Sequence, residues 1–412
     1  MAKPTPEDVF TPARPVGDDM FATREYEHLQ DRVEAALREQ GRQVVLFGLT
    51  GVGKTSLVGY LCRNRRIPYV RVECGPTFEA MMREALAKVV GNEEIESIES
   101  HSTEVGIGAT LYGLLRGDLK AKSGTDTKFE RYPISLATAV AEAFRLKKKK
   151  VLFLDNYENL LGKHHEQETS RALVELMKSF ADRAAETGTD TPKVVVAGIP
   201  AVSEALIMLD SATSRRIAQV EVPRMADAEL DQILTRGEEK LGIKFEGLLR
   251  DRIIQSSDGF PYYAHMFALH CSRRAIHAGR TNVMIDDFDA SLASILADCD
   301  LELRTAYEAA VETTGKVQMR KSVMEAIATL NDLEVPFKAI RESFLKLHPE
   351  YGSIDKLNFL STSITPLKDT YRILTDSGKP KSPNNKYRFF NPLMRGYVRL
   401  RMLNEAQGDL GI

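Results

Sequence analysis

A lysine and two hydroxyl residues end a short glycine-rich segment near the start of the chain. The segment reads GLTGVGKTS and matches the G-x-x-x-x-G-K-[ST] spacing of phosphate-binding loops. Its glycines let successive backbone N–H groups point at one anion, and the helix that follows adds the partial positive charge of its first turn. The lysine of this pattern reaches the β- and γ-phosphates, and the hydroxyl after it ligates Mg²⁺. The residues predicted to hold a nucleoside triphosphate are Gly48, Leu49, Thr50, Gly51, Val52, Gly53, Lys54, Thr55 and Ser56.

The metal ion of such a site also needs a carboxylate at the end of a neighbouring apolar strand. The run VLFLD supplies four apolar residues that end in Asp155, about 100 residues after the loop. We predict that Asp155 and the Thr55 hydroxyl hold Mg²⁺ together.

A strand before the loop and a helix after it would position these side chains. The order of apolar, β-branched runs and helical stretches predicts a parallel sheet with helices on both faces. The predicted fold class is therefore α/β, with a three-layer P-loop NTPase core over residues 21–222 and a glycine-rich insert of unknown role at 101–124. The predicted strands are 43–47, 68–74, 151–155 and 193–199, and the predicted helices between them include 77–90, 134–144 and 169–187.

With these motifs in hand, the chain resembles the AAA+ and STAND-type ATPases, near the clade of origin-recognition initiators. Phe21, Arg24 and Glu25 match the pattern of a large apolar residue and Arg-Glu that opens the first helix in that group, and SDGFPYYAHMFALH resembles the Gly-x-Pro element of STAND proteins at Gly259 and Pro261. The resemblance covers residues 10–300. It implies ATP rather than GTP as the ligand, Pro261 near the nucleotide, and a small helical lid over residues 223–303.

The chain departs from that group at the residue after the metal carboxylate. The resemblance implies a glutamate there to polarise the attacking water, but Asn156 takes the place, and an amide cannot accept a proton. Glu158 would substitute if the strand end curls. We expect slow hydrolysis or a nucleotide-gated switch.

The lid and the fourth strand depart from the pattern as well. The fourth strand ends in AGIP, without a polar residue at the usual γ-phosphate sensor position, and no arginine directly follows Gly259. We expect Tyr262, Tyr263 and His265 to replace a direct phosphate contact with a softer one.

Arg215 and Arg216 fall where the resemblance places an arginine finger that reaches the nucleotide of a neighbouring subunit. Such an arginine offsets charge on the γ-phosphate during transfer. The alternative is an exposed pair that makes surface salt bridges of little energetic value. The first interpretation predicts a homo-oligomer.

The last segment, residues 304–412, predicts a winged helix-turn-helix. Helices are expected at 320–333, 337–347, 354–368 and 392–403, and two strands of a wing at 371–377 and 385–391. Residues 336–402 carry thirteen Lys and Arg against five Asp and Glu, a local charge of +8. That charge suits contact with duplex DNA, although winged helices also serve as protein-interaction and lid modules. The candidate DNA-contacting residues are Lys356, Asn358, Lys379, Lys381 and Lys386, with the hydroxyls of Ser361, Thr362 and Ser363 beside them.

Composition limits the setting of the protein. The net charge is −2, so any contact with nucleic acid has to be local. The four cysteines form no Cys-x-x-Cys pair, which predicts buried thiols without a disulfide framework or zinc site. Residues 1–20 are predicted to be a flexible segment, and no apolar run suggests a signal peptide or a membrane span. We expect a cytoplasmic protein without membrane contact.

Three functions follow from these residues. The leading hypothesis is an ATPase that acts as a molecular switch with ATP, ADP and Mg²⁺ as ligands, in defence, mobile-element control or another signalling task, with a protein partner or further copies of itself. The second is a DNA-binding initiator, loader or transposition regulator. The third is a nucleotide-binding subunit that barely turns over, and the sequence leaves the trigger and effector open.

Overall fold

The computed structural model describes residues 4–91, 136–187, 192–200, 213–312, 319–377 and 385–409, together with Val202 and Leu206. The predicted insert at 101–124, and with it Lys379 and Lys381 of the wing, lies outside these residues. The chain forms two compact units. We call residues 23–49 and 53–223 the core unit, and residues 1–22, 50–52 and 224–412 the C-terminal unit.

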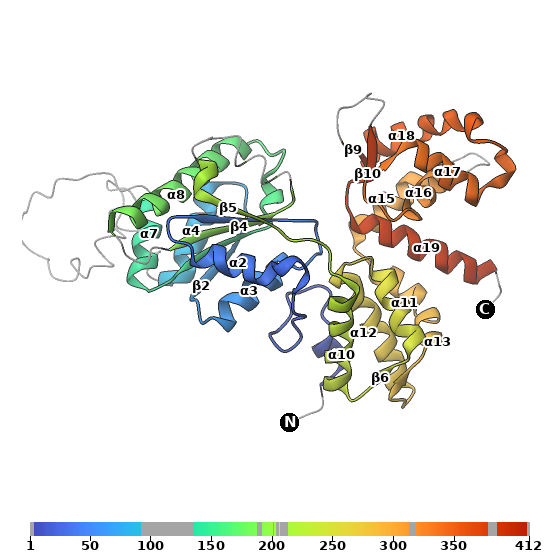
Figure 1. Cartoon of the computed structure of the whole chain (residues 1–412), viewed down its shortest axis with the longest axis horizontal. Helices are drawn as coiled ribbons and strands as arrows, with labels where there is room; N and C mark the ends of the chain where they lie inside the picture. Colours follow the sequence, from blue (N-terminus) through green and yellow to red (C-terminus); the bar gives the residue numbers. More distant parts are fainter. Residues whose placement is uncertain are drawn as a thin grey trace, which may run out of the picture. The chain divides into compact units, whose positions relative to one another are not determined.

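The core unit is built on a five-stranded sheet in the order β2-β3-β4-β1-β5, with all neighbouring strands parallel. This arrangement confirms the predicted α/β class (Figure 1). The apolar residues of β3 are buried without alternation, as expected for a strand covered on both faces. The fifth strand was not predicted from the sequence. The strands are β1 (Gln43–Phe47), β2 (Tyr69–Glu73), β3 (Val151–Asp155), β4 (Lys193–Gly198) and β5 (Ile217–Glu221).

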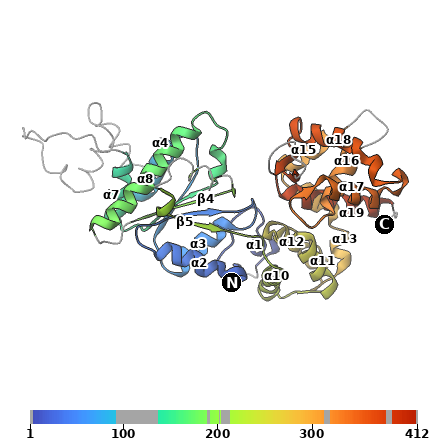
Figure 2. The same ribbon diagram turned by 45° about the horizontal axis from the view of Figure 1, so that its top comes forward.

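Helices cover both faces of this sheet. One layer holds α4 (Phe78–Val90), α7 (Leu136–Leu146) and α8 (Glu166–Thr187), whose apolar side chains share a core with those of β2, β3 and β4. The other layer holds α2 (Leu29–Arg38) and α3 (Lys54–Asn64), as Figures 1 and 2 show. Short 3-10 helices lie at Tyr26–His28, Tyr157–Leu160 and Thr213–Arg216.

The C-terminal unit begins with a bundle of helices and a two-stranded parallel pair. The short helix α1 (Pro6–Val9) packs with this bundle, although the sequence predicted a flexible segment there. The physical reason is Phe10, which is 1% exposed and occupies the space that a side chain at Gly237 would need. The bundle elements are α10 (Asp227–Leu241), β6 (Lys244–Phe245), α11 (Gly247–Ser257), α12 (Pro261–His277), β7 (Asn282–Val283), α13 (Ile285–Asp289) and α14 (Leu292–Asp298).

The rest of the C-terminal unit is consistent with the predicted winged helix. Its sheet has three strands, because Val335 of β8 pairs with Tyr387 of β10, where the sequence predicted two. The predicted helix at 320–333 ends at Ala328, and the one at 354–368 divides into the 3-10 helix Ile354–Phe359 and α18. A further 3-10 helix is Pro349–Tyr351. The elements are α15 (Leu301–Val311), α16 (Met319–Ala328), β8 (Val335–Pro336), α17 (Phe337–Leu347), α18 (Leu360–Asp369), β9 (Leu374–Ser377), β10 (Lys386–Phe389) and α19 (Leu393–Asp409).

Two sequence-based expectations about the whole chain can be compared with the structure. All four cysteines are free and buried, which confirms the predicted thiols. Within the ranges described, no helix is long and apolar enough to cross a membrane.

Helix α19 meets the bundle at a glycine. A Cβ added to Gly396 would lie 2.5 Å from a ring carbon of Tyr263 on α12, closer than side chains pack. The Tyr263 hydroxyl donates to the Leu393 carbonyl at 2.6 Å. Gly396 therefore permits the close approach of α19 to α12.

We predict that Gly396→Ala lowers the free energy of unfolding of the C-terminal unit by about 2 kcal/mol, because the added methyl group overpacks this contact. Calorimetric melting of the full chain measures the change. Gly247→Ala is the matched control, since a Cβ there meets no atom within 4 Å. Equal melting of the two variants would show that α19 does not rest on Tyr263.

Candidate functional site

The phosphate loop connects the end of β1 to the start of α3, and two of its glycines are required by geometry. A Cβ on Gly48 would lie 2.4 Å from the Val222 carbonyl oxygen, so only glycine fits beside β5. Gly53 caps α3 with a φ of +92°, in the left-handed region that glycine adopts at no steric cost. Both positions therefore require glycine, as expected for a loop whose backbone approaches a phosphate closely.

Lys54 is the first residue of α3 and is 6% exposed. Its ammonium donates to the carbonyl oxygens of Gly48 and Leu49, at 2.9 and 3.1 Å. Burial lowers the pKa of Lys54, and the nearby carboxylates of Glu158 and Asp155 act against that shift. The lysine is thus held against its own loop, with two carboxylates in electrostatic range.

Thr55 and Asp155, the pair predicted to hold Mg²⁺, lie in contact with each other. The Thr55 hydroxyl donates to Oδ2 of Asp155 at 2.8 Å, and the Asp155 side chain is fully buried at the end of β3. A hydroxyl beside a carboxylate is the donor set with which phosphate-loop proteins hold Mg²⁺, so these two residues fit the ion.

The end of β3 curls at Asn156, which has a φ of +56°. Its side-chain amide donates to Glu73 at 3.2 Å. The turn brings Glu158 to the end of β4, where its Oε2 lies 3.2 Å from the place of a Cβ on Gly198. That oxygen is buried and has no hydrogen-bond partner in the described part of the chain. An unpaired buried carboxylate oxygen is costly, so Glu158 is a strong candidate for a role in the site.

Arg71 is a site residue that the sequence analysis missed. Its Nε and Nη2 lie 2.9 and 2.8 Å from Oδ2 of Asp155, the oxygen that also accepts from Thr55. The contact joins two neighbouring strands, β2 and β3. The motif spacings give no sign of it, because it depends on strand pairing.

Of the three residues that match the pattern before the phosphate loop, two are buried and one is exposed. Phe21 is 3% exposed and Arg24 is 1% exposed, whereas Glu25 is exposed. Arg24 donates to the Pro223 carbonyl at 2.7 Å, at the end of the core unit. Arg215 and Arg216 lie on the 3-10 helix before β5, with Arg215 exposed.

The Gly-x-Pro element opens α12 of the C-terminal unit. Gly259 has a φ of +78°, and a Cβ there would lie 2.7 Å from the Arg224 Cβ, so glycine is needed for both the turn and the approach of Arg224. Pro261 occupies the first turn of α12, where its missing N–H costs nothing.

Two side chains expected to make a soft phosphate contact do something else. Tyr263 is fully buried and bonded to α19, and burial raises its pKa well above the usual value. His265 is 4% exposed and accepts a hydrogen bond from the Thr11 N–H at 3.3 Å, and burial lowers its pKa to about 4. That prediction was wrong for Tyr263 and His265, which hold α19 and the N-terminal segment. Tyr262 is half-buried beside Tyr263.

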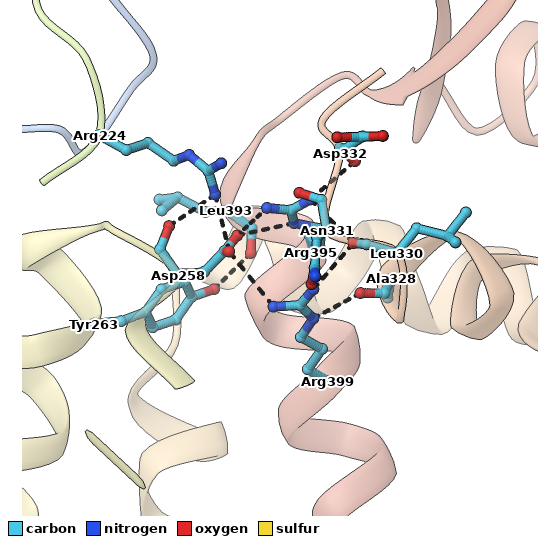
Figure 3. A network of polar contacts seen from close by, with 10 residues as sticks. All are labelled: Arg224, Asp258, Tyr263, Ala328, Leu330, Asn331, Asp332, Leu393, Arg395 and Arg399. Carbon is cyan, nitrogen blue, oxygen red and sulfur yellow. Dashed lines mark hydrogen bonds and ion pairs between the residues drawn. The ribbon is translucent and has the colours of Figure 1, made fainter. Parts of the chain in front are cut away.

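Asp258, just before the Gly-x-Pro element, gathers three arginines (Figure 3). Arg224 donates to its Oδ1 at 2.9 Å, and Arg395 of α19 donates twice to its Oδ2, at 2.8 and 2.5 Å. Arg399 lies 3.5 Å from Oδ1. Arg395 is 2% exposed and also donates to the carbonyls of residues 330–332. One carboxylate thus connects the turn between α11 and α12 with Arg224, which precedes α10, and with α19.

The candidate DNA-contacting residues lie on the winged helix. Lys356 and Asn358 are exposed on the 3-10 helix before α18, and Lys386 is exposed at the start of β10. Asn358 accepts from Arg341 at 2.9 Å. Ser363 is 8% exposed and so presents less surface than Lys356, Asn358 and Lys386.

Comparison with known proteins adds three kinds of similarity. A family model described as Novel STAND NTPase 1 matches residues 14–277. The ATPase subunit HslU of an ATP-dependent protease from Exiguobacterium sibiricum is 24% identical over 254 residues, which make up 53% of this chain and 56% of that protein. The chain thus aligns with about half the length of this curated relative.

Several solved structures are similar to the chain. Cdc6p from Pyrobaculum aerophilum shares 16% identity, with 98% of this chain and 100% of that one covered and a TM-score of 0.45. A Walker-type ATPase of Pyrococcus abyssi shares 16% identity, with 92% and 96% covered and a TM-score of 0.48. The ORC1 protein of Aeropyrum pernix, solved in complex with DNA, shares 14% identity, with 98% of each chain covered and a TM-score of 0.43.

Of these findings, the match to the family model is the one that assigns the chain to a family. It spans more than half of the 412 residues and includes the phosphate loop, Asp155 and the Gly-x-Pro element. The chain therefore belongs to the Novel STAND NTPase 1 family and is a P-loop NTPase of the STAND type.

Proposed function

We propose that the chain is a Mg²⁺-dependent ATPase whose nucleotide state switches the arrangement of its lid and winged helix. The observation that carries this proposal is the contact between Thr55 and Asp155 at the phosphate loop, with Lys54 in range of Asp155 and Glu158. These residues supply a loop that binds phosphate, the ammonium group of Lys54, a pair that can bind a metal ion, and the carboxylate of Glu158.

The residues divide the reaction between them. The loop N–H groups and Lys54 bind the β- and γ-phosphates, and Thr55 and Asp155 would hold Mg²⁺, which neutralises charge that develops on the transferred group. Glu158 orients the attacking water and accepts its proton, because Asn156 has no group that can do so. We infer that hydrolysis is slow, since the base stands two residues beyond its usual position.

We predict that Glu158→Gln lowers kcat about 100-fold or more with nucleotide affinity little changed, because the amide keeps the shape and loses the base. Phosphate release by the purified chain measures kcat, and a fluorescent ATP analogue measures affinity. Lys54→Ala should lose nucleotide binding as well as turnover, and GTP competition in the same assay tests the expected preference for ATP.

Glu168→Gln is the matched control, since Glu168 is an exposed glutamate on α8 whose side chain is 87% accessible. Turnover that survives Glu158→Gln would remove Glu158 from the mechanism. Tight binding without turnover in the wild type would instead support the third hypothesis, a nucleotide-binding subunit of a larger assembly.

The switch is supported by the cluster around Asp258. Its carboxylate contacts the guanidinium groups of Arg224, Arg395 and Arg399, so it is the shared anchor for all three (Figure 3). Asp258 directly precedes Gly259 and Pro261, and Arg395 and Arg399 belong to α19. A nucleotide that shifts the Gly-x-Pro element would therefore act on α19 through one carboxylate.

We predict that Asp258→Asn removes the nucleotide response of α19 and destabilises the C-terminal unit by about 3 kcal/mol, because buried Arg395 loses its counter-charge. Hydrogen exchange of α19 amides with ADP and with an ATP analogue measures the response. Asp231→Asn is the control: it breaks an ion pair with Arg250 on the lid, 40% exposed at the aspartate, and should cost less than about 1 kcal/mol. A response that persists in Asp258→Asn would rule out this route.

A second candidate function, duplex DNA binding, is favoured by the exposed Lys356 and Lys386 on the winged helix. Phosphate contacts by these lysines would add affinity without sequence readout. In this reading, Arg215 and Arg216 serve as the arginine finger of a homo-oligomer.

If duplex DNA is bound, Lys386→Ala should weaken binding at about 50 mM salt and lower the slope of log affinity against log salt by about 1. Fluorescence anisotropy with labelled duplex measures both quantities. Lys163→Ala, an exposed lysine of the core unit, is the control. No binding by the wild type at this low salt concentration would exclude the DNA hypothesis.

A further inference from the structure

Arg71 lies in β2, the edge strand of the sheet, and its guanidinium group contacts Asp155, the carboxylate that is expected to hold the metal ion. Arg71 pairs with Phe153 in the β2–β3 ladder, and Asp155 lies two residues further along β3. Because side chains two residues apart share a face of a strand, Arg71, Phe153 and Asp155 lie on the same face of the sheet. That face is opposite to the one on which Val70 and Val72 join the core with α4, α7 and α8.

The contact concentrates on one oxygen. Oδ2 of Asp155 accepts from the Thr55 hydroxyl at 2.8 Å and from Arg71 Nε at 2.9 Å, with Nη2 at 2.8 Å. Oδ1 accepts only the Asn156 N–H, at 3.1 Å, among the hydrogen bonds of the described residues. The arginine thus occupies the same side of the carboxylate as the hydroxyl that would ligate Mg²⁺.

The two side chains of this ion pair differ in exposure and therefore in how easily they can move. Asp155 is fully buried, whereas the Arg71 side chain is 41% exposed. A long, half-exposed arginine on an edge strand can leave its partner without opening the core. Asp155 cannot move away, because both of its oxygens are bonded and its strand is paired on both sides, with β2 and β4.

We propose that Arg71 is a positioning residue of the nucleotide site, which fixes the Asp155 carboxylate and competes with Mg²⁺ for it. Arg71 supplies the positive charge that the buried carboxylate requires and yields Oδ2 when Mg²⁺ enters with the nucleotide. The competition sets how much the metal ion strengthens nucleotide binding. This inference rests on the proposed function, because it assumes that the loop binds a nucleotide together with Mg²⁺.

A purely structural role for Arg71 leads to the opposite expectation. If Arg71 only props Asp155 in place, its removal leaves the carboxylate poorly aimed and weakens the contribution of Mg²⁺. If Arg71 competes with the metal ion, its removal strengthens that contribution, because a cation less than 3 Å from the carboxylate no longer opposes the second cation. The sign of the change therefore distinguishes the two roles.

The test compares the affinity of a fluorescent, non-hydrolysable ATP analogue for the full chain with Mg²⁺ and with EDTA. The ratio of the two dissociation constants reports the coupling between metal and nucleotide without any turnover. We expect Arg71→Met to increase this ratio by roughly threefold to tenfold over the wild type. Arg71→Lys keeps the charge and should stay close to the wild-type ratio.

Arg83→Met is the matched control, because Arg83 is 43% exposed on α4 of the same unit and pairs with Glu79 rather than with the site. Its ratio should equal that of the wild type. An unchanged or smaller ratio in Arg71→Met, in protein that melts like the wild type, would overturn the competition. A wild type that binds no nucleotide would overturn the proposed function and this inference with it.

Discussion

The buried carboxylate of Asp155 is the constraint on which the nucleotide site depends. A charge that is fully removed from water must be paired and hydrogen-bonded, and Asp155 receives a hydroxyl from α3, a guanidinium from β2 and the N–H of its own successor. The first two partners come from elements other than β3, so both the register between β2 and β3 and the start of α3 must be correct for the carboxylate to be satisfied. The phosphate loop is fixed by the same requirement, because Thr55 belongs to both.

Much of this arrangement could be predicted from local sequence, and the physical reason is that the signals are local. The runs VVLF before Gly48 and VLFL before Asp155 are apolar without alternation because both faces of those strands are covered, and the glycines mark backbone shapes that other residues cannot adopt. Contacts across the sheet leave no such mark. Arg71 was missed because its partner depends on strand order, and β5 was missed because its exposed residues interrupt the apolar pattern. Tyr263 and His265 were expected to contact phosphate because their burial depends on how α12 packs against its neighbours, which the local sequence does not show.

In the C-terminal unit, too, a buried charge requires partners of the opposite sign, but there the buried group is the arginine Arg395. There a single acidic residue satisfies several arginines, and it does so from a position with a φ of +51°, directly before Gly259 at +78°. Two consecutive left-handed residues reverse the chain between α11 and α12 and place the Asp258 side chain toward α19. The sequence predicted the importance of Gly259 and Pro261 but not of Asp258. Two of its three arginine partners, Arg395 and Arg399, lie more than 130 residues away in the sequence.

The exchange of the usual glutamate for Asn156 can now be connected to backbone geometry. The left-handed conformation of residue 156 costs most L-residues about 1–2 kcal/mol, whereas asparagine is among the few that adopt it readily. The turn that this conformation creates is the one that carries Glu158 to the end of β4. A glutamate at position 156 would therefore strain the turn while adding a second carboxylate to the site. Asn156 and Glu158 therefore belong together. Asn156 removes the carboxylate from its own position, and the left-handed turn that it permits places the carboxylate of Glu158 at the site instead.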